Sequence, residues 1–225
     1  MKHLVLTTIA AVVLVGCGPS MSIHDAAELG SLEIVKKHIS AGGDVNAKNT
    51  QGSTPLMTAA IGIPLGAEAN KHLKETVKFL IMSGADVNVK NSTGETALHG
   101  AASFGNKDIC NLLIQNGAIL NAKNSKGSTP LIMAISSADK DITELLIING
   151  AEINLKGRNR GTALHYAVGL GYEEISKILI NSGADVNALN DYEKTPVDIA
   201  ISNRIADLLR KHGGKTGEEL KAEGK

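Results

Sequence analysis

Three histidines are the side chains of this sequence best suited to acid–base or metal chemistry. His24, His99 and His165 each stand fourth in a short segment that recurs along the chain. Packed helices lie about 8–10 Å apart, so His99 and His165, two repeats apart, are expected roughly 20 Å from each other. Metal ligands must lie about 2 Å from a shared ion. The spacing therefore predicts no common metal site.

The two cysteines cannot form a disulfide framework. Cys110 stands among apolar residues of an expected helix, where a thiol serves as a small hydrophobic group and lacks the basic neighbour that a nucleophile needs. The sequence also has no glycine-rich phosphate loop, paired-carboxylate motif or Ser-His-Asp grouping in a supporting context. We therefore expect no catalytic residue, no cofactor and no small-molecule substrate.

Composition narrows the class of protein further. The 225 residues include 23 basic and 23 acidic side chains, 43% hydrophobic residues and only 2% aromatic residues. A nucleic-acid partner calls for positive charge and aromatic stacking platforms, so none is expected. A core of Leu, Ile, Val and Ala suits many thin helices packed closely together.

A unit of 33 residues repeats through the chain and must position these side chains. Its threonine recurs at intervals of 42, 33, 33 and 33 residues, and the pattern reaches back to Met21. A hydroxyl followed by Pro suits the start of a first helix, apolar pairs such as Leu145-Leu146 fill a second helix, and a glycine follows that helix. The five threonines are Thr54, Thr96, Thr129, Thr162 and Thr195.

Thr96-Ala97-Leu98-His99 and its counterparts resemble the signature of ankyrin repeats. The resemblance covers residues 21–214 and implies an all-α solenoid of about six helix-turn-helix units, joined by projecting β-hairpin fingers. It also implies that His24, His99 and His165 brace turns. We expect Asn46, Asn88, Asn121, Asn154 and Asn187 to form local Asx turns. Residues 215–225 are expected to form a charged tail, frayed or briefly helical near 218–222.

The first residues of the chain are typical of a secretory targeting signal. Lys2 and His3 precede an apolar run of about 12 residues, which is too short to span a bilayer. Leu14-Val15-Gly16-Cys17 resembles the lipobox of bacterial lipoproteins, which implies a signal peptide over 1–16, an acylated Cys17 and a short linker over 17–20. An ordinary cleaved signal is the alternative. Gly18 favours the outer membrane of the cell envelope, facing the periplasm, as the destination.

Departures from the repeat pattern indicate where recognition takes place. Tyr and Arg are enriched at interface hot spots, and the later fingers carry several such residues in place of framework ones. Four lysines at one finger position form a ladder, which we expect acidic neighbours to neutralise. The candidate partner-binding residues are Lys126, Arg158, Arg160, Tyr166 and Tyr192, with Phe104 as a weaker addition.

The second unit is nine residues too long, and the excess falls within 61–74. The simpler interpretation is a tolerated turn insertion with a longer second helix, and the alternative is an added contact surface. For the whole chain, we expect a monomeric, membrane-anchored, non-catalytic scaffold that binds an unknown protein through its concave finger and first-helix surface. The alternatives are an accessory subunit of an envelope enzyme and a passive structural envelope protein.

Overall fold

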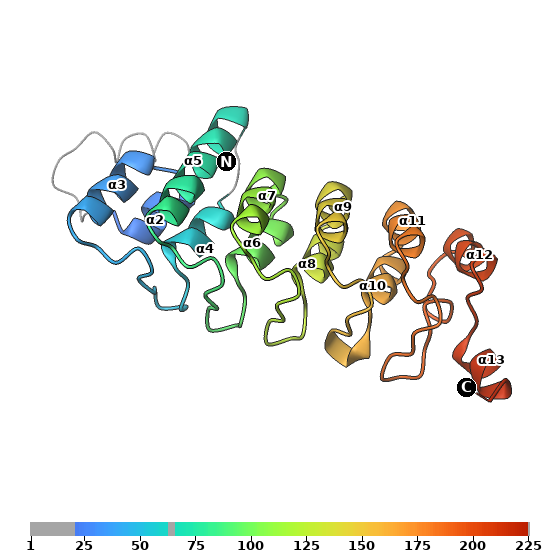
Figure 1. Cartoon of the computed structure of the whole chain (residues 1–225). Coiled ribbons are helices and arrows are strands. Elements are labelled where there is room, and N and C mark those ends of the chain that lie inside the picture. The colour runs from blue at the N-terminus through green and yellow to red at the C-terminus, as the bar shows by residue number, and fades with distance from the viewer. Residues whose placement is uncertain (1–20, 63–65, 225) are drawn as a thin grey trace, which may run out of the picture.

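Pairs of antiparallel helices stack side by side along the chain (Figure 1). The computed structural model describes residues 21–62 and 66–224. The first helices of successive units are α2 (Ile23–Glu28), α4 (Pro55–Ala60), α6 (Ala97–Ser103), α8 (Pro130–Ser136) and α10 (Ala163–Gly169). The second helices are α3 (Leu32–Ser40), α5 (Ala67–Met82), α7 (Lys107–Gln115), α9 (Lys140–Ile148), α11 (Glu173–Asn181) and α12 (Asn203–Lys211).

The start and end of each helix follow from local chemistry. Thr54 and Thr129 each accept a hydrogen bond from the amide three residues later, and Pro follows both, where its missing N–H costs nothing. The second helices end at glycines with positive φ, such as Gly84 at 92° and Gly117 at 83°. This is the left-handed cap that only glycine adopts without strain.

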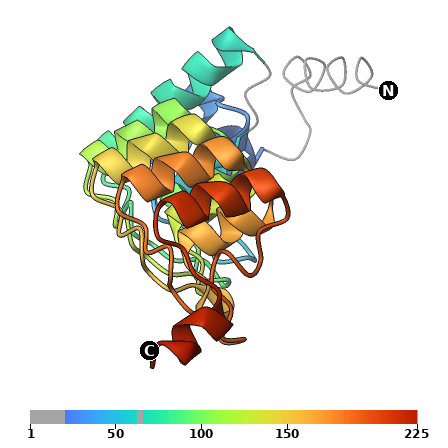
Figure 2. The same cartoon turned by 90° about the vertical axis from the view of Figure 1, so that its right-hand side faces the viewer.

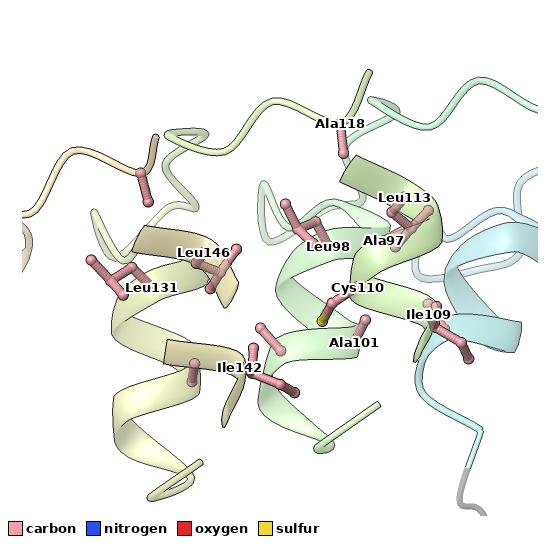
Figure 3. Packing of buried hydrophobic residues seen from close by; sticks show 14 of the residues in the cluster. Ala97, Leu98, Ala101, Ile109, Cys110, Leu113, Ala118, Leu131, Ile142 and Leu146 are labelled. Atoms are coloured by element: carbon pink, nitrogen blue, oxygen red, sulfur yellow. The ribbon is translucent and has the colours of Figure 1, made fainter. Parts of the chain in front are cut away.

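The core is a thin aliphatic layer between the two rows of helices (Figures 2 and 3). First helices contact first helices of the neighbouring units, and second helices contact second helices. Leu98, Leu113 and Leu131 are fully buried within units three and four, and Ile109 is buried on the side of unit three that faces unit two. Cys110 is buried among them and fills space there. Because each layer is only one helix pair deep, small aliphatic side chains fill it.

The fingers between the units are tight turns. Each tip is closed by a backbone hydrogen bond between its first and fifth residues, as from Asn91 to Glu95 at 3.0 Å. The Asn91 Oδ1 atom also accepts the amides of Thr93 and Glu95. Within 21–62 and 66–224 no residue is assigned to a β-strand, so the hairpins that the resemblance implies are turns and not strand pairs.

The extra length of the second unit enters its second helix. Helix α5 has 16 residues, whereas the other second helices have nine. The unit is tied to the next one by Asn106, whose Nδ2 donates to the carbonyls of Ala60 and Gly62 at 2.8 and 3.1 Å. The longer second helix that the simpler interpretation includes is therefore present.

The C-terminal segment is folded back onto the last finger and is not a free tail. Helix α13 (Gly217–Ala222) begins at Thr216 with a capping box formed with Glu219. Ion pairs join Arg210 to Glu219 and Lys221 to Glu193 of the fifth finger. The Arg210 guanidinium holds the pKa of Glu219 at about 2.

Candidate functional site

The histidines bridge adjacent units. The His99 Nδ1 atom accepts the Thr96 amide at 3.2 Å, and its Nε2 atom lies 3.1 Å from the Ser128 carbonyl of the next unit. His165 repeats this geometry between Thr162 and the Lys194 carbonyl. Because a carbonyl only accepts, Nε2 carries the proton and the ring is neutral. Burial lowers the pKa of both histidines.

His24 and Asp198 occupy the same repeat position as His99 and His165, but their hydrogen-bond partners differ. The His24 ring meets the Ala47 carbonyl at 2.9 Å, still reaching toward its neighbouring finger. In the sixth unit Asp198 replaces the histidine. Its Oδ2 atom accepts the amides of Thr195 and Gly217, both at 2.8 Å. The neighbouring segment offers a donor here instead of a carbonyl, so an acceptor side chain takes the place of the imidazole.

The asparagine column also bridges units, and the expected local Asx turns are wrong for it. The Asn154 Nδ2 atom donates to the Gly183 carbonyl at 3.1 Å, and its Oδ1 atom accepts the Asp185 amide at 2.8 Å. Each asparagine of the column makes this pair of bonds to the following unit, Asn121 using the Glu152 side chain as its acceptor. The five are Asn46, Asn88, Asn121, Asn154 and Asn187.

The lysine ladder has the same role. The Nζ atoms of Lys90, Lys123 and Lys156 donate to carbonyls one finger further along, at Lys123, Lys156 and Leu189, over 3.0, 2.7 and 3.2 Å. The bonds run along the stack and do not join the acidic residues of the same finger. These three lysines therefore connect successive fingers.

The fourth finger departs most from the others. Gly157 stands where the other tips have Asn, and a Cβ atom there would lie only 2.8 Å from Ile132 Cδ1. Its tip is a short 3-10 turn, η1 (Arg158–Arg160), in which Asn159 and Arg160 adopt φ of 52° and 53°. The Tyr166 hydroxyl donates to the Arg158 carbonyl at 3.4 Å, so the first helix supports this tip. Burial raises the pKa of Tyr166.

Three of the five candidate residues meet at one place. Arg158, Tyr166 and Tyr192 line a cleft of about 180 Å³ between the fourth and fifth fingers. Tyr192 is 67% exposed and is the most exposed aromatic side chain of the described chain. Arg160 faces a separate hollow of about 440 Å³ and lies 3.9 Å from the Asp191 carboxylate. Lys126 is exposed on the third fingertip, at the position that corresponds to Tyr192.

A second hollow on the same face was missed by sequence reasoning. It has a volume of about 320 Å³ between the second and third units. Met57, Ile61, Phe104 and Met133 form its apolar side, and polar residues such as Gln51, Asn91 and Glu95 form the other side. Gly100 forms part of its wall in close contact with Ile61, at the first-helix position that Tyr166 occupies two units later. The signal in the sequence was that glycine together with Phe104, which is 50% exposed.

The remaining features of the structure concern the Cys110 thiol, metal binding and membrane-spanning helices. Burial raises the pKa of the Cys110 thiol to about 12, which keeps the sulfur protonated. Within the described residues no group of three or more His, Cys, Asp or Glu could hold a metal ion. None of the helices in that same part of the chain has the length and apolar character needed to cross a membrane.

A family model described as ankyrin repeats, in three copies, matches residues 65–157 and 138–218. The chain therefore belongs to the ankyrin-repeat family, and the all-α ankyrin solenoid expected from the sequence is confirmed. Ankyrin repeats indicate a protein–protein interaction module. A search of curated proteins finds no match to this chain.

The buried histidines predict a pH dependence of stability. Protonating His99 or His165 places a hydrogen on Nδ1, which then no longer accepts the threonine amide. Because their pKa values are lowered in the fold, the unfolded chain takes up protons first as the pH falls below about 6.5. The free energy of unfolding therefore decreases from pH 7.5 toward pH 5, as measured by urea titration.

The matched variants separate this effect from other titrations. We expect the double variant His99→Gln/His165→Gln to show a flatter profile over this range, while His212→Gln, which changes an exposed ring, keeps the wild-type slope. An unchanged slope in the double variant would show that the two rings do not couple protonation to unfolding.

Proposed function

We propose that this protein is a membrane-anchored, non-catalytic scaffold that binds another protein through the surface of its fingers and first helices. The family membership supports an interaction module in general. The observation that carries the proposal is the cleft between the fourth and fifth fingers, where Arg158, Tyr166 and Tyr192 come together from three segments of the chain.

The physical properties of this cleft suit a protein partner. Tyr side chains offer a large contact area with few rotatable bonds, and Arg offers several hydrogen-bond donors on one rigid plane. The Tyr166 hydroxyl donates to the Arg158 carbonyl of the fourth fingertip at 3.4 Å, and this contact favours a cleft that is formed without a partner. A preformed site loses less conformational entropy on binding. The scaffold acts as a monomer in this proposal.

The proposed membrane anchor rests on the sequence Leu14-Val15-Gly16-Cys17, which resembles a lipobox. This segment lies outside the residues that the structure describes. Acylation of Cys17 after removal of residues 1–16 would leave the repeat domain, over 21–214, close to the membrane through the linker 17–20. Several acyl chains on one cysteine hold a protein far more firmly than one chain does. The outer membrane of a bacterial envelope, with the repeats in the periplasm, is the location we propose.

Crosslinked pull-down from envelopes tests partner binding. We expect the wild type to retain at least one defined protein, and the variant Arg158→Glu/Tyr192→Ala to lose it, because the charge and the aromatic surface of the cleft are both removed. Lys78→Glu, on the exposed side of α5, is the matched control and keeps the partner. A partner list identical in all three samples would exclude the cleft as the binding site.

Metabolic labelling with a fatty-acid analogue tests the anchor. The wild type is expected to incorporate the label, whereas Cys17→Ala incorporates none, because the acyl chains are attached to that sulfur. Cys110→Ala is the control and labels normally, since this thiol is buried. Equal labelling of wild type and Cys17→Ala would contradict the lipid anchor and leave the partner site unaffected.

A further inference from the structure

We infer that the partner presents an extended peptide segment with one bulky apolar side chain and, about six residues away, a cluster of acidic side chains. The apolar residue would enter the hollow at Gly100, and the acidic residues would meet Lys126 and Arg158. This inference rests on the proposed function and specifies the chemistry of the partner.

The apolar end of the site is the hollow between the second and third units, beside a close contact between their first helices. A Cβ atom on Gly100 would lie 2.6 Å from Ile61 Cγ2, so the first helices of units two and three approach closely there. Next to this contact, Phe104 and Met133 wall a hollow of about 320 Å³. That volume accommodates a Leu, Met or Phe side chain.

The two hollows belong to one continuous face. Gly100, Met133 and Tyr166 occupy the same position in the first helices of three successive units. Met133 lines the apolar hollow, and Tyr166 lines the cleft between the fourth and fifth fingers. Units stack about 8–10 Å apart, so the two hollows are roughly 20 Å from each other. An extended chain crosses that distance in about six residues.

Charge changes sign along this face. The tip of the second finger carries Glu95, whose carboxylate borders the apolar hollow. The next tip carries Lys126, and the fourth carries Arg158, which borders the cleft. Within the described chain neither cation forms an ion pair, and both are exposed. The acidic side chains of the fifth finger, in contrast, are paired: Asp191 with Arg160, and Glu193 with Lys221.

This pattern of charge selects the partner and its register. Acidic side chains gain by meeting unpaired Lys126 and Arg158, whereas placing them beside Glu95 is repulsive. The same asymmetry disfavours a uniformly acidic chain. A segment therefore binds with its apolar residue at the Gly100 hollow and its acidic residues at the later fingers. Tyr192 adds an exposed ring against which the acidic end of the segment packs.

Selection of displayed random 12-residue peptides on the purified full-length protein tests this inference. We expect the enriched peptides to share one large aliphatic or aromatic residue and at least two acidic residues about five to seven positions from it. A synthetic peptide of the enriched sequence is then titrated by fluorescence anisotropy. Its affinity is expected to fall as salt is raised, because screening weakens the charged contacts.

The variants assign each part of the peptide to its contact. Arg158→Glu and Lys126→Glu should each weaken binding about fivefold or more, and Phe104→Ser should weaken it to a similar extent without changing the salt dependence. Lys78→Glu should bind as the wild type does. Circular dichroism at each variant's working temperature confirms that the helices are retained.

The outcomes separate the inference from the proposed function. Enriched peptides without acidic residues, or peptides whose binding is unaffected by Arg158→Glu and Lys126→Glu, would overturn the inference. If the envelope pull-down still retains a partner in that case, the scaffold function stands. If neither experiment yields a bound peptide or protein, both proposals fall.

Discussion

A single helix pair of this protein is too thin to bury its own apolar face, and every other feature of the structure depends on how that limitation is met. Stacking covers the aliphatic faces of neighbouring units. Hydrophobic contact is non-directional and leaves the register of one unit on the next undefined. Polar side chains supply the direction. Asn154, Lys156 and His165 each reach from one unit to a backbone group of the following unit.

These bridges determine which side chains are available for binding. The asparagine, histidine and lysine columns are used within the stack, so the fingers and first helices are held at fixed spacing. What remains free is the set of positions that vary between units, such as Gly100, Lys126 and Tyr192. A regular framework therefore presents an irregular face, with an apolar hollow, a basic tip and an aromatic cleft in succession. Shape and charge on that face come from particular substitutions, since the fold is shared by the whole family.

Much of the fold was predictable from the sequence because recurring residues mark the start and end of the helices in each repeat. The threonine and glycine columns mark where helices start and end, and local capping chemistry explains both. The partners of the asparagine column were not predictable in this way, because a short amide satisfies a local turn as readily as a neighbouring unit. The segment after residue 214 was predicted to be a charged tail, because its contacts with Asp198 and Glu193 depend on residues that are distant in the sequence.

The candidate site was predicted in part. Comparison between units identified Arg158, Tyr166 and Tyr192, which do meet. Arg160 was grouped with them because it stands where the earlier fingers have glycine, yet it adopts φ of 53° and lies in another hollow beside Asp191. The hollow between the second and third units was missed because its walls, which include Met57, Phe104 and Met133, come from different units and meet only in the folded stack.

Equilibrium urea unfolding of Asn154→Ala tests the central claim, that side-chain bridges between units hold the stack. The claim predicts a loss of about 1–2 kcal/mol, because the substitution removes two hydrogen bonds across one unit boundary. Asn149→Ala is the matched control. Its amide donates within its own helix, to the Leu145 carbonyl, so its loss should stay below about 0.5 kcal/mol. Equal losses for the two variants would contradict the account.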